Sequence, residues 1–489
     1  MLRTGTEYLE SLRDGRVIYV GAEKVTDVTR HPAFCNAARS FAAIYDMKRA
    51  PENRDVFTFE EDGGRHSAYY LRAKTKEDLV KRMKLHRAIA RMSHGLLGRS
   101  PDHVSGFVAG MAANPSVFGR YADNLLAYYS YLRRTDAYAV YAVIPPQAAR
   151  NPEYYEKQNI PVPTLRVVRE DDAGVVISGM KMLATGAVFA NEVWIGNLIP
   201  LAPNQLAESI TCAVPVNSKG LTLWSRKPFE RHAAVEFENP LAHRFDETDS
   251  MVMCDEVKVP WERVFVHNDA VLAREIYIKT PAHCYGNHQS NVRFHEKLRL
   301  LVGLASRVTQ ASGADQVPAV RETLGRLAAL EASLGGMIAG QIQDAEEWPA
   351  GYLTFNRRYM YAALNWCTEG HSAIIDCIRE LCGGGVFQMP ADISVMQDKG
   401  LRASFESYWQ TPQTGAVARM KLFKLAWDLI GSEFAGRHAQ YEKFYAGASF
   451  IVRNHNFREA PWDDFHFAVD NLLAGYGYPG ERPEGDPAN

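Results

Sequence analysis

The chain has 489 residues, of which 46% are hydrophobic and 23% charged, and its formal net charge is −2. This length allows two or three structural units around a large shared core. The near-neutral charge excludes a broad basic surface for nucleic acid or anionic lipid.

The sequence carries no signal for a membrane or an oxidising compartment. The first residues lack an apolar signal core, and no apolar run approaches the length that spans a bilayer. The seven cysteines are scattered, and none forms a Cys-x-x-Cys pair. We therefore expect reduced thiols, no membrane association and a cytoplasmic location.

Residues 1–137 are predicted to be mostly helical. A helix is expected over residues 75–97, because Thr75 can cap it and Asp78 follows three residues later. Pro101, two residues after Arg99, then prevents any further helix. One guanidinium is thereby placed at a helix exit.

Residues 138–275 are predicted to form a β domain, with β-prone runs at 138–144, 165–169, 175–179, 193–196, 211–216 and 255–260. The second and third runs flank an Asp-Asp-Ala-Gly segment, which is typical of a hairpin. Helix returns after about residue 290, where apolar residues from Val320 to Met337 recur at spacings of three and four. This pattern predicts a helix-bundle domain over 276–480, followed by a flexible tail over 481–489.

The run Gly-Arg-Ser-Pro-Asp-His at residues 98–103 is the most informative motif. The guanidinium of Arg99 keeps its charge and can bind an oxyanion with two parallel hydrogen bonds. This motif therefore indicates a site for an anionic ligand.

Four further motifs accompany it in order: Met-Leu-Ala-Thr-Gly-Ala at 182–187, Asn-His-Gln-Ser-Asn-Val-Arg at 287–293, Gly-Gly-Gly at 383–385 and Phe-Tyr-Ala-Gly at 444–447. With these five motifs the chain resembles the oxygenase component of the 4-hydroxyphenylacetate 3-monooxygenase family, which includes chlorophenol and nitrophenol monooxygenases. The resemblance covers nearly the whole chain.

The resemblance implies an α+β, mostly α, acyl-CoA dehydrogenase-like fold. It would have an N-terminal helical domain, a middle β-barrel domain and a C-terminal four-helix bundle, assembled as a homotetramer. The implied activity is that of a two-component flavin monooxygenase. A separate NAD(P)H:flavin reductase delivers reduced FAD, O2 adds at flavin C4a to give a hydroperoxide, and one oxygen atom goes to a phenol. A halide or nitro group leaves if the attacked carbon carries one, and no metal is expected.

By resemblance, the flavin site contains Thr185, whose hydroxyl would face the flavin N5 edge, with Ala184 and Gly186 beside it. A structural threonine in a β-turn is the alternative. Gly383, Gly384 and Gly385 could bring backbone amides near a pyrophosphate, or could simply end a helix.

By resemblance, His288 is the catalytic base, since a histidine can take a phenolic proton near neutral pH. Arg437 matches a second active-site arginine, which would lower the phenol pKa together with Arg99. The alternatives are a structural histidine and a salt-bridged bundle arginine.

The chain departs from the family pattern at two positions. The hydroxyphenylacetate branch has a tyrosine four residues after the motif arginine and a histidine near the first strand, whereas this chain has His103 and Tyr141. Both residue types can donate to a phenolate oxygen, so Arg99, His103 and Arg437 would hold it. The identity of the phenol stays open.

Three other functions are alternatives for this sequence. A lyase of the 4-hydroxybutyryl-CoA dehydratase type would place cluster ligands at Arg99, His103, His288 and His295, but the three cysteine ligands are absent. A non-catalytic flavin-binding protein is the second alternative. An acyl-CoA oxidase or dehydrogenase would need a carboxylate base, which no motif supplies.

Overall fold

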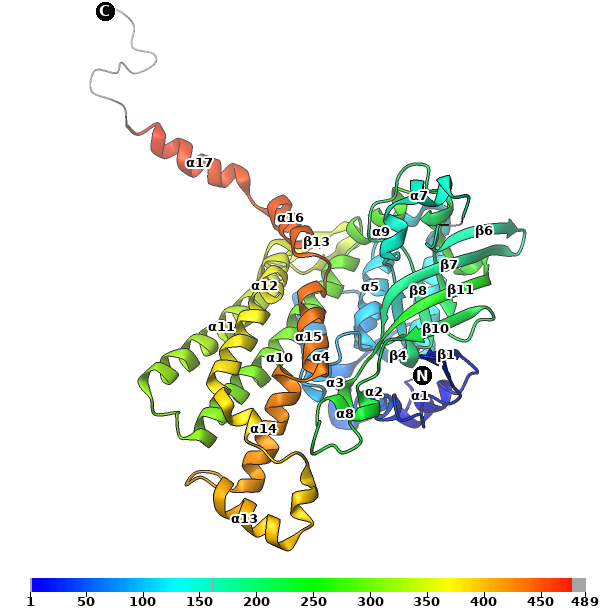
Figure 1. Ribbon diagram of the computed structural model, residues 1–489. Helices are drawn as coiled ribbons and strands as arrows, with labels where there is room; N and C mark the ends of the chain where they lie inside the picture. The colour runs from blue at the N-terminus through cyan, green and yellow to red at the C-terminus, as the bar shows by residue number, and fades with distance from the viewer. Residues whose placement is uncertain (1, 161, 477–489) are drawn as a thin grey trace, which may run out of the picture.

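The computed structural model describes residues 2–160 and 162–476 and shows a helical N-terminal region, two sheets and a C-terminal set of long helices (Figure 1). The predicted α+β class with a helical majority and a C-terminal bundle is confirmed. None of the described helices is both long enough and apolar enough to cross a membrane. All seven cysteines are free thiols.

The N-terminal region consists of α1 (Gly5–Ser11), β1 (Val17–Val20), β2 (Glu23–Val25), α2 (Cys35–Arg49), α3 (Arg54–Phe57), β3 (Thr58–Glu61), β4 (Gly64–Ser67), α4 (Lys76–Met92), α5 (Asp102–Ala112) and α6 (Ala122–Thr135). Thr75 caps α4, and Asp78 completes the expected capping box. The helix was expected to reach residue 97 but ends at Met92. His94 and Gly95 have φ of 51° and 72°, which stops the helix.

Gly95 is required at this position for a second reason. A Cβ there would lie 2.4 Å from the carbonyl oxygen of Arg293, so the chain passes against α10 (Ala282–Ser312) at this point. The segment from Gly95 to α5 therefore leaves α4 as a turn packed on α10, and Arg99 lies on this turn.

The middle region consists of β5 (Ala139–Ala142), α7 (Pro152–Lys157), β6 (Arg166–Asp171), β7 (Gly174–Thr185), β8 (Glu192–Ile195), β9 (Thr211–Pro215), β10 (Leu221–Ser225), α8 (Ala242–Phe245), β11 (Asp249–Pro260) and β12 (Val264–Val266). The expected hairpin is confirmed by the antiparallel pairing of β6 and β7.

The expectation of a β-barrel is wrong. The described strands form two open sheets, ordered β2-β1-β10-β11-β7-β6 and β12-β9-β8-β5. Strand β6 forms one edge of the first sheet. Its last four residues, from Val168 to Asp171, are exposed, and three of them are charged, which is typical of an edge strand. At the other edge, β1 and β2 come from the segment expected to be helical, and β1 pairs in parallel with β10.

The C-terminal region consists of α9 (Leu272–Ile278), α10, α11 (Pro318–Gln343), β13 (Glu346–Trp348), β14 (Tyr352–Thr354), α12 (Arg357–Cys382), α13 (Lys399–Trp409), α14 (Ala416–Ile430), α15 (Glu433–Phe444), α16 (Ser449–Glu459) and α17 (Trp462–Leu473). Helix α17 projects away from the body (Figure 1). The predicted tail over 481–489 lies outside the described residues.

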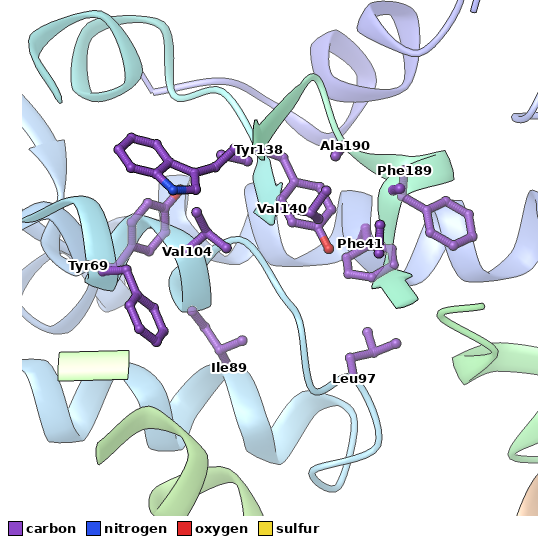
Figure 2. Close-up of a cluster of buried hydrophobic side chains, with 14 of the residues drawn as sticks. Phe41, Tyr69, Ile89, Leu97, Val104, Tyr138, Val140, Phe189 and Ala190 are labelled. Atoms are coloured by element: carbon purple, nitrogen blue, oxygen red, sulfur yellow. The ribbon is translucent and has the colours of Figure 1, made fainter. Parts of the chain in front are cut away.

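The hydrophobic core continues under the turn that carries Arg99. Figure 2 shows Leu97 and Val104, which flank this turn, in one cluster with Ile89 of α4, Tyr138 before β5 and Phe189. Helix α10 is buried on all sides from Cys284 to Leu298. The turn is thus held between the N-terminal core and the central helix of the bundle.

Candidate active site

Arg99 lies at the centre of a buried polar cluster. Its Nη1 donates to Nε2 of His103 at 2.7 Å, and its Nη2 donates to the carbonyl oxygen of Tyr445 at 2.6 Å. The guanidinium lies 4.0 Å from the centre of the Tyr445 ring and 5.1 Å from that of Tyr141. Burial alone would lower the pKa of Arg99, but the Tyr141, Tyr445 and Tyr441 rings and Glu247 raise it above its usual value. The cation is therefore permanent.

His103, in the first turn of α5, and Tyr141, on β5, face each other with ring centres 5.4 Å apart. Phe107, one turn further along α5, closes the group at 5.2 Å from His103. Burial, followed by the charge of Arg99, holds the pKa of His103 well below its ordinary value, so the imidazole is neutral. The structure thus brings together three of the predicted residues: Arg99, His103 and Tyr141.

A small apolar cavity of about 10 Å³ lies beside this group. Its lining is Val104, Phe107, Val108, Met111, Tyr141, Trp194 and Tyr277, none of which carries a charge at neutral pH. This volume holds about one water molecule. A ring could enter beside Tyr141 only if the surrounding side chains moved apart.

Gln289 and Tyr445 also belong to the cluster, although the sequence analysis gave them no role. Oε1 of Gln289 lies 3.1 Å from Nδ1 of His103. The Tyr445 hydroxyl donates to the carbonyl oxygen of Gly98 at 2.7 Å. Burial raises the pKa of Tyr445 to about 12, so its hydroxyl keeps its proton. Both residues lie within matched motifs, which was the available signal.

His288 lies on a different face of α10. Its ring stacks on Phe355 with centres 3.5 Å apart, and its Nδ1 lies 2.7 Å from Oε1 of Gln341. The nearest other histidine is His86, at 6.2 Å between ring centres. Burial, followed by the charge of His86, lowers the pKa of His288 well below its ordinary value. No described hydrogen bond joins His288 to Arg99, His103 or Tyr141, and its role as base stays a prediction.

Arg437, on α15, binds the buried carboxylate of Glu247 and the half-buried carboxylate of Asp249. It contacts Glu247 at 3.0 Å, and it contacts both oxygens of Asp249 at 2.7 and 3.0 Å. Asp249 in turn accepts a hydrogen bond from the Thr185 hydroxyl at 2.6 Å. Burial works against the charge of Arg437, but these two carboxylates raise its pKa well above the usual value. The arginine is therefore paired within the chain, as the alternative in the sequence analysis expected, and it lies beside the predicted flavin residue.

Glu247 connects this pair to the Arg99 turn. Its Oε2 accepts from the backbone nitrogens of Gly98 and Arg99 at 2.8 and 3.0 Å, while its Oε1 accepts from Arg437. One carboxylate thereby links the predicted phenol-binding arginine to α15.

An exposed apolar side chain precedes Thr185 at the end of β7. Leu183 is 61% exposed and has φ of 61°, so a strained backbone holds an apolar side chain in solvent two residues before Thr185. Gly186 has φ of 76°, and a Cβ there would lie 2.6 Å from the Tyr138 hydroxyl. Ala184, between them, is buried in the sheet. The contact of Thr185, Ala184 and Gly186 with a flavin stays a prediction.

Gly383, Gly384 and Gly385 follow the end of α12. A Cβ at Gly385 would lie 2.6 Å from the Phe423 ring of α14, so this glycine allows close packing of the two helices. No described hydrogen bond joins the three glycines to Thr185 or Arg99. Their contact with a pyrophosphate stays a prediction.

The lyase alternative finds no cluster of ligands. In the described residues, no group of three or more His, Cys, Asp or Glu side chains could hold a metal ion. Of the four positions considered, Arg99 and His103 bind each other, and His295 lies 2.9 Å from Glu331.

Comparisons with known proteins match most of the length of the chain. Family models described as the N-terminal and C-terminal parts of 4-hydroxyphenylacetate 3-hydroxylase match residues 4–266 and 273–474. The pyoverdin chromophore biosynthetic protein PvcC of Pseudomonas aeruginosa is 34% identical, covering 92% of this chain and 90% of its own length. The oxygenase component of 4-nitrophenol 2-monooxygenase from a Rhodococcus species is 33% identical, with 92% and 87% covered.

Solved structures agree. The oxygenase component of 4-hydroxyphenylacetate 3-monooxygenase, complexed with FAD and 4-hydroxyphenylacetate, superposes with a TM-score of 0.92 at 29% identity, covering 97% of this chain and 98% of that one. The 4-hydroxybutyryl-CoA dehydratase of N. maritimus has a TM-score of 0.86 at 18% identity, covering 100% and 98%, and so shares the fold.

Proposed function

This chain belongs to the 4-hydroxyphenylacetate 3-hydroxylase family, and we propose that it is the oxygenase component of a two-component, FAD-dependent phenol monooxygenase. The observation that carries this proposal is the set of buried Arg99 and His103 with the half-buried Tyr141, beside an apolar wall and linked through Glu247, Arg437 and Asp249 to Thr185.

The chain's own residues prepare the phenol. Arg99 carries a permanent charge and can pair with the phenol oxygen, which lowers the phenol pKa and holds the phenolate. Tyr141 and Phe107 can pack against the ring. An ionised oxygen raises electron density at the ring carbons, so this binding also activates the substrate. The surrounding apolar residues exclude water from the site.

The Thr185 face would hold the flavin. Thr185, Gly186 and the exposed Leu183 fit the ring, while Arg437 and Asp249 fix the Thr185 hydroxyl. When bound, reduced FAD reacts with O2 and supplies an electrophilic oxygen atom to the phenol. A relative has been solved with both FAD and 4-hydroxyphenylacetate. A separate NAD(P)H:flavin reductase would supply the reduced FAD, as the two-component names of the relatives suggest.

Product analysis with externally reduced FAD tests this proposal. The purified chain is mixed with photoreduced FAD, oxygen and separate samples of 4-hydroxyphenylacetate, 4-chlorophenol and 4-nitrophenol. We expect a catechol or quinol from at least one phenol, with release of chloride or nitrite if the substituted carbon is attacked. Formation of hydrogen peroxide alone with every phenol would support a non-catalytic flavin-binding protein instead.

We also propose that four copies assemble. Helix α17 has no buried residue, and Phe467 and Leu472 on it are 70% and 67% exposed. Apolar side chains on a projecting helix are typical of a surface that another chain covers. Light scattering during gel filtration should give about four times the mass of one chain.

A further inference from the structure

We propose that His103 takes the phenolic proton at its Nε2 atom, and that Gln289 is the positioning residue that keeps this nitrogen available. This inference rests on the proposed function and deepens it. It assigns the base to a position where the hydroxyphenylacetate branch has a tyrosine, and it gives a role to a glutamine that the resemblance left without one.

The orientation of the Gln289 amide is fixed by an atom that can only accept. Its Nε2 lies 3.4 Å from the carbonyl oxygen of Gly98, which has no proton to give. The amide nitrogen must therefore face Gly98, and the amide oxygen must face Nδ1 of His103 at 3.1 Å.

The tautomer of His103 follows from both of its neighbours. An amide oxygen at Nδ1 requires that Nδ1 carry the proton. At the other end of the ring, Nη1 of Arg99 lies 2.7 Å from Nε2, and a guanidinium can only donate. Nε2 is therefore the lone-pair nitrogen. Nη1 of Arg99 lies nearer to Nε2 than to Nδ1, at 2.7 against 3.5 Å, so its position agrees with the tautomer that Gln289 selects.

The proton transfer balances within the cluster. The phenol O–H bond breaks, an N–H bond forms at Nε2, and the electron pair stays on the oxygen beside Arg99. The resulting imidazolium donates from Nδ1 to Gln289 and from Nε2 to the phenolate. Gln289 thus serves both forms of the ring, because its oxygen accepts from Nδ1–H before and after the transfer.

The charged and titratable groups that face His103 come from every element packed around it. They are Arg99 in the turn, His86 on α4, Tyr141 on β5, Arg293 on α10 and Tyr445 after α15. Burial and the two arginines oppose a charge on the free histidine. A phenolate oxygen that displaced Nη1 of Arg99 from its 2.7 Å contact with Nε2 would supply the missing negative charge, so protonation becomes favourable only when a phenol is bound.

The test uses the full-length protein and 4-nitrophenol, whose ionised form is yellow, without FAD or oxygen. We compare the wild type with Gln289→Met, which keeps the length but loses the acceptor, and with Gln289→Glu, which keeps an acceptor and adds a charge. Nitrophenolate colour is recorded against pH at saturating protein. The ¹⁵N resonances of labelled histidine report the tautomer of His103 and are assigned with His103→Asn.

We expect wild-type His103 to show the Nδ1–H tautomer. Gln289→Met should mix the two tautomers and lower the affinity for nitrophenolate about tenfold. Gln289→Glu should retain the tautomer and move the ionisation of bound nitrophenol by at least half a pH unit, because a carboxylate stabilises the imidazolium. An Nε2–H tautomer in the wild type would overturn the proposal. So would equal losses in both variants with an unchanged ionisation curve, which would indicate a packing role alone. Because this test needs no flavin, a failed hydroxylation assay leaves its result intact.

Discussion

Replacement of Glu247 by glutamine should loosen the Arg99 turn and destabilise the fold together. The carboxylate accepts three charge-assisted hydrogen bonds, from Gly98 N at 2.8 Å, Arg99 N at 3.0 Å and Arg437 Nη1 at 3.0 Å. A glutamine oxygen can still accept from the two backbone nitrogens, but its NH2 group then faces the Arg437 guanidinium. The variant loses one ion pair and weakens two further bonds.

The expected cost is about 2–4 kcal/mol, since hydrogen bonds to charged groups contribute about 1.5–3 kcal/mol each and a broken buried pair costs about 3–5 kcal/mol. We place it below the top of that range because Arg437 keeps Asp249. Urea unfolding at fixed protein concentration measures it. Glu10→Gln is the control, because Glu10 pairs with Arg13 on the surface and should cost under about 1 kcal/mol. If Glu247→Gln proved no more costly than this control, the turn would not depend on the carboxylate. The same variant should also release more peroxide per product.

Three further perturbations separate the parts of the site. In Arg99→Lys, the single amine cannot contact Nε2 of His103 and the Tyr445 carbonyl together. The yield of product per FAD oxidised should therefore fall at least tenfold, while flavin affinity is unchanged. A yield equal to that of the wild type would show that the guanidinium does not bind the substrate. His288→Ala distinguishes the two candidate bases, His288 and His103. If His288 is the base, as the family resemblance implies, most product should be lost. The contacts of His288 with Phe355 and Gln341 instead predict a product yield within about threefold of wild type and a loss of about 2–4 kcal/mol in the free energy of unfolding. Burial would raise the pKa of Glu442, but Arg293 and Lys297 hold it well below its usual value. Its ion pairs therefore stabilise the fold above about pH 4.3, the unfolded value, and urea unfolding should show the stability falling below that pH; a flat profile there would contradict the assignment.

Local features of the fold could be predicted from the sequence, because short-range chemistry determines them. Thr75 and Asp78 form the expected cap of α4, and the Asp-Asp-Ala-Gly segment forms the expected hairpin between β6 and β7. The end of α4 was predicted five residues too late, at residue 97 instead of Met92. Gly95 in the sequence is typical of a residue that follows the end of a helix, and it has the left-handed conformation. The pairing of β1 with β10 joins residues about two hundred positions apart, and no local pattern indicates it.

The site could be predicted only where a motif and its partners lie close in sequence. Arg99 and His103 are four residues apart on one turn and the following helix, and the structure joins them directly. His288 and Gln289 are adjacent on α10, so their side chains differ in direction by about 100°. A helix with one polar face would have shown which of the two points inward. This helix is buried on every side from Cys284 to Leu298, so its sequence has no periodic alternation of polar and apolar residues that would show which side chain faces the site.

The carboxylate pair of Glu247 and Asp249 explains how one bundle arginine can influence two chemical events. Arg437 holds both residues, one of which fixes the Arg99 backbone while the other fixes the Thr185 hydroxyl. Under the proposed function, the residues that would bind the phenol oxygen and the flavin edge are thus linked through one guanidinium on α15, which shares Asp249 with Arg226. Oxygen transfer depends on the distance between these two groups more than on either affinity, because the reacting atoms must approach closely before water intervenes. A buried ion network is a poor source of net stability but a good means of fixing such a separation, since several bonds hold each member at once, as both Arg437 and Arg226 hold Asp249.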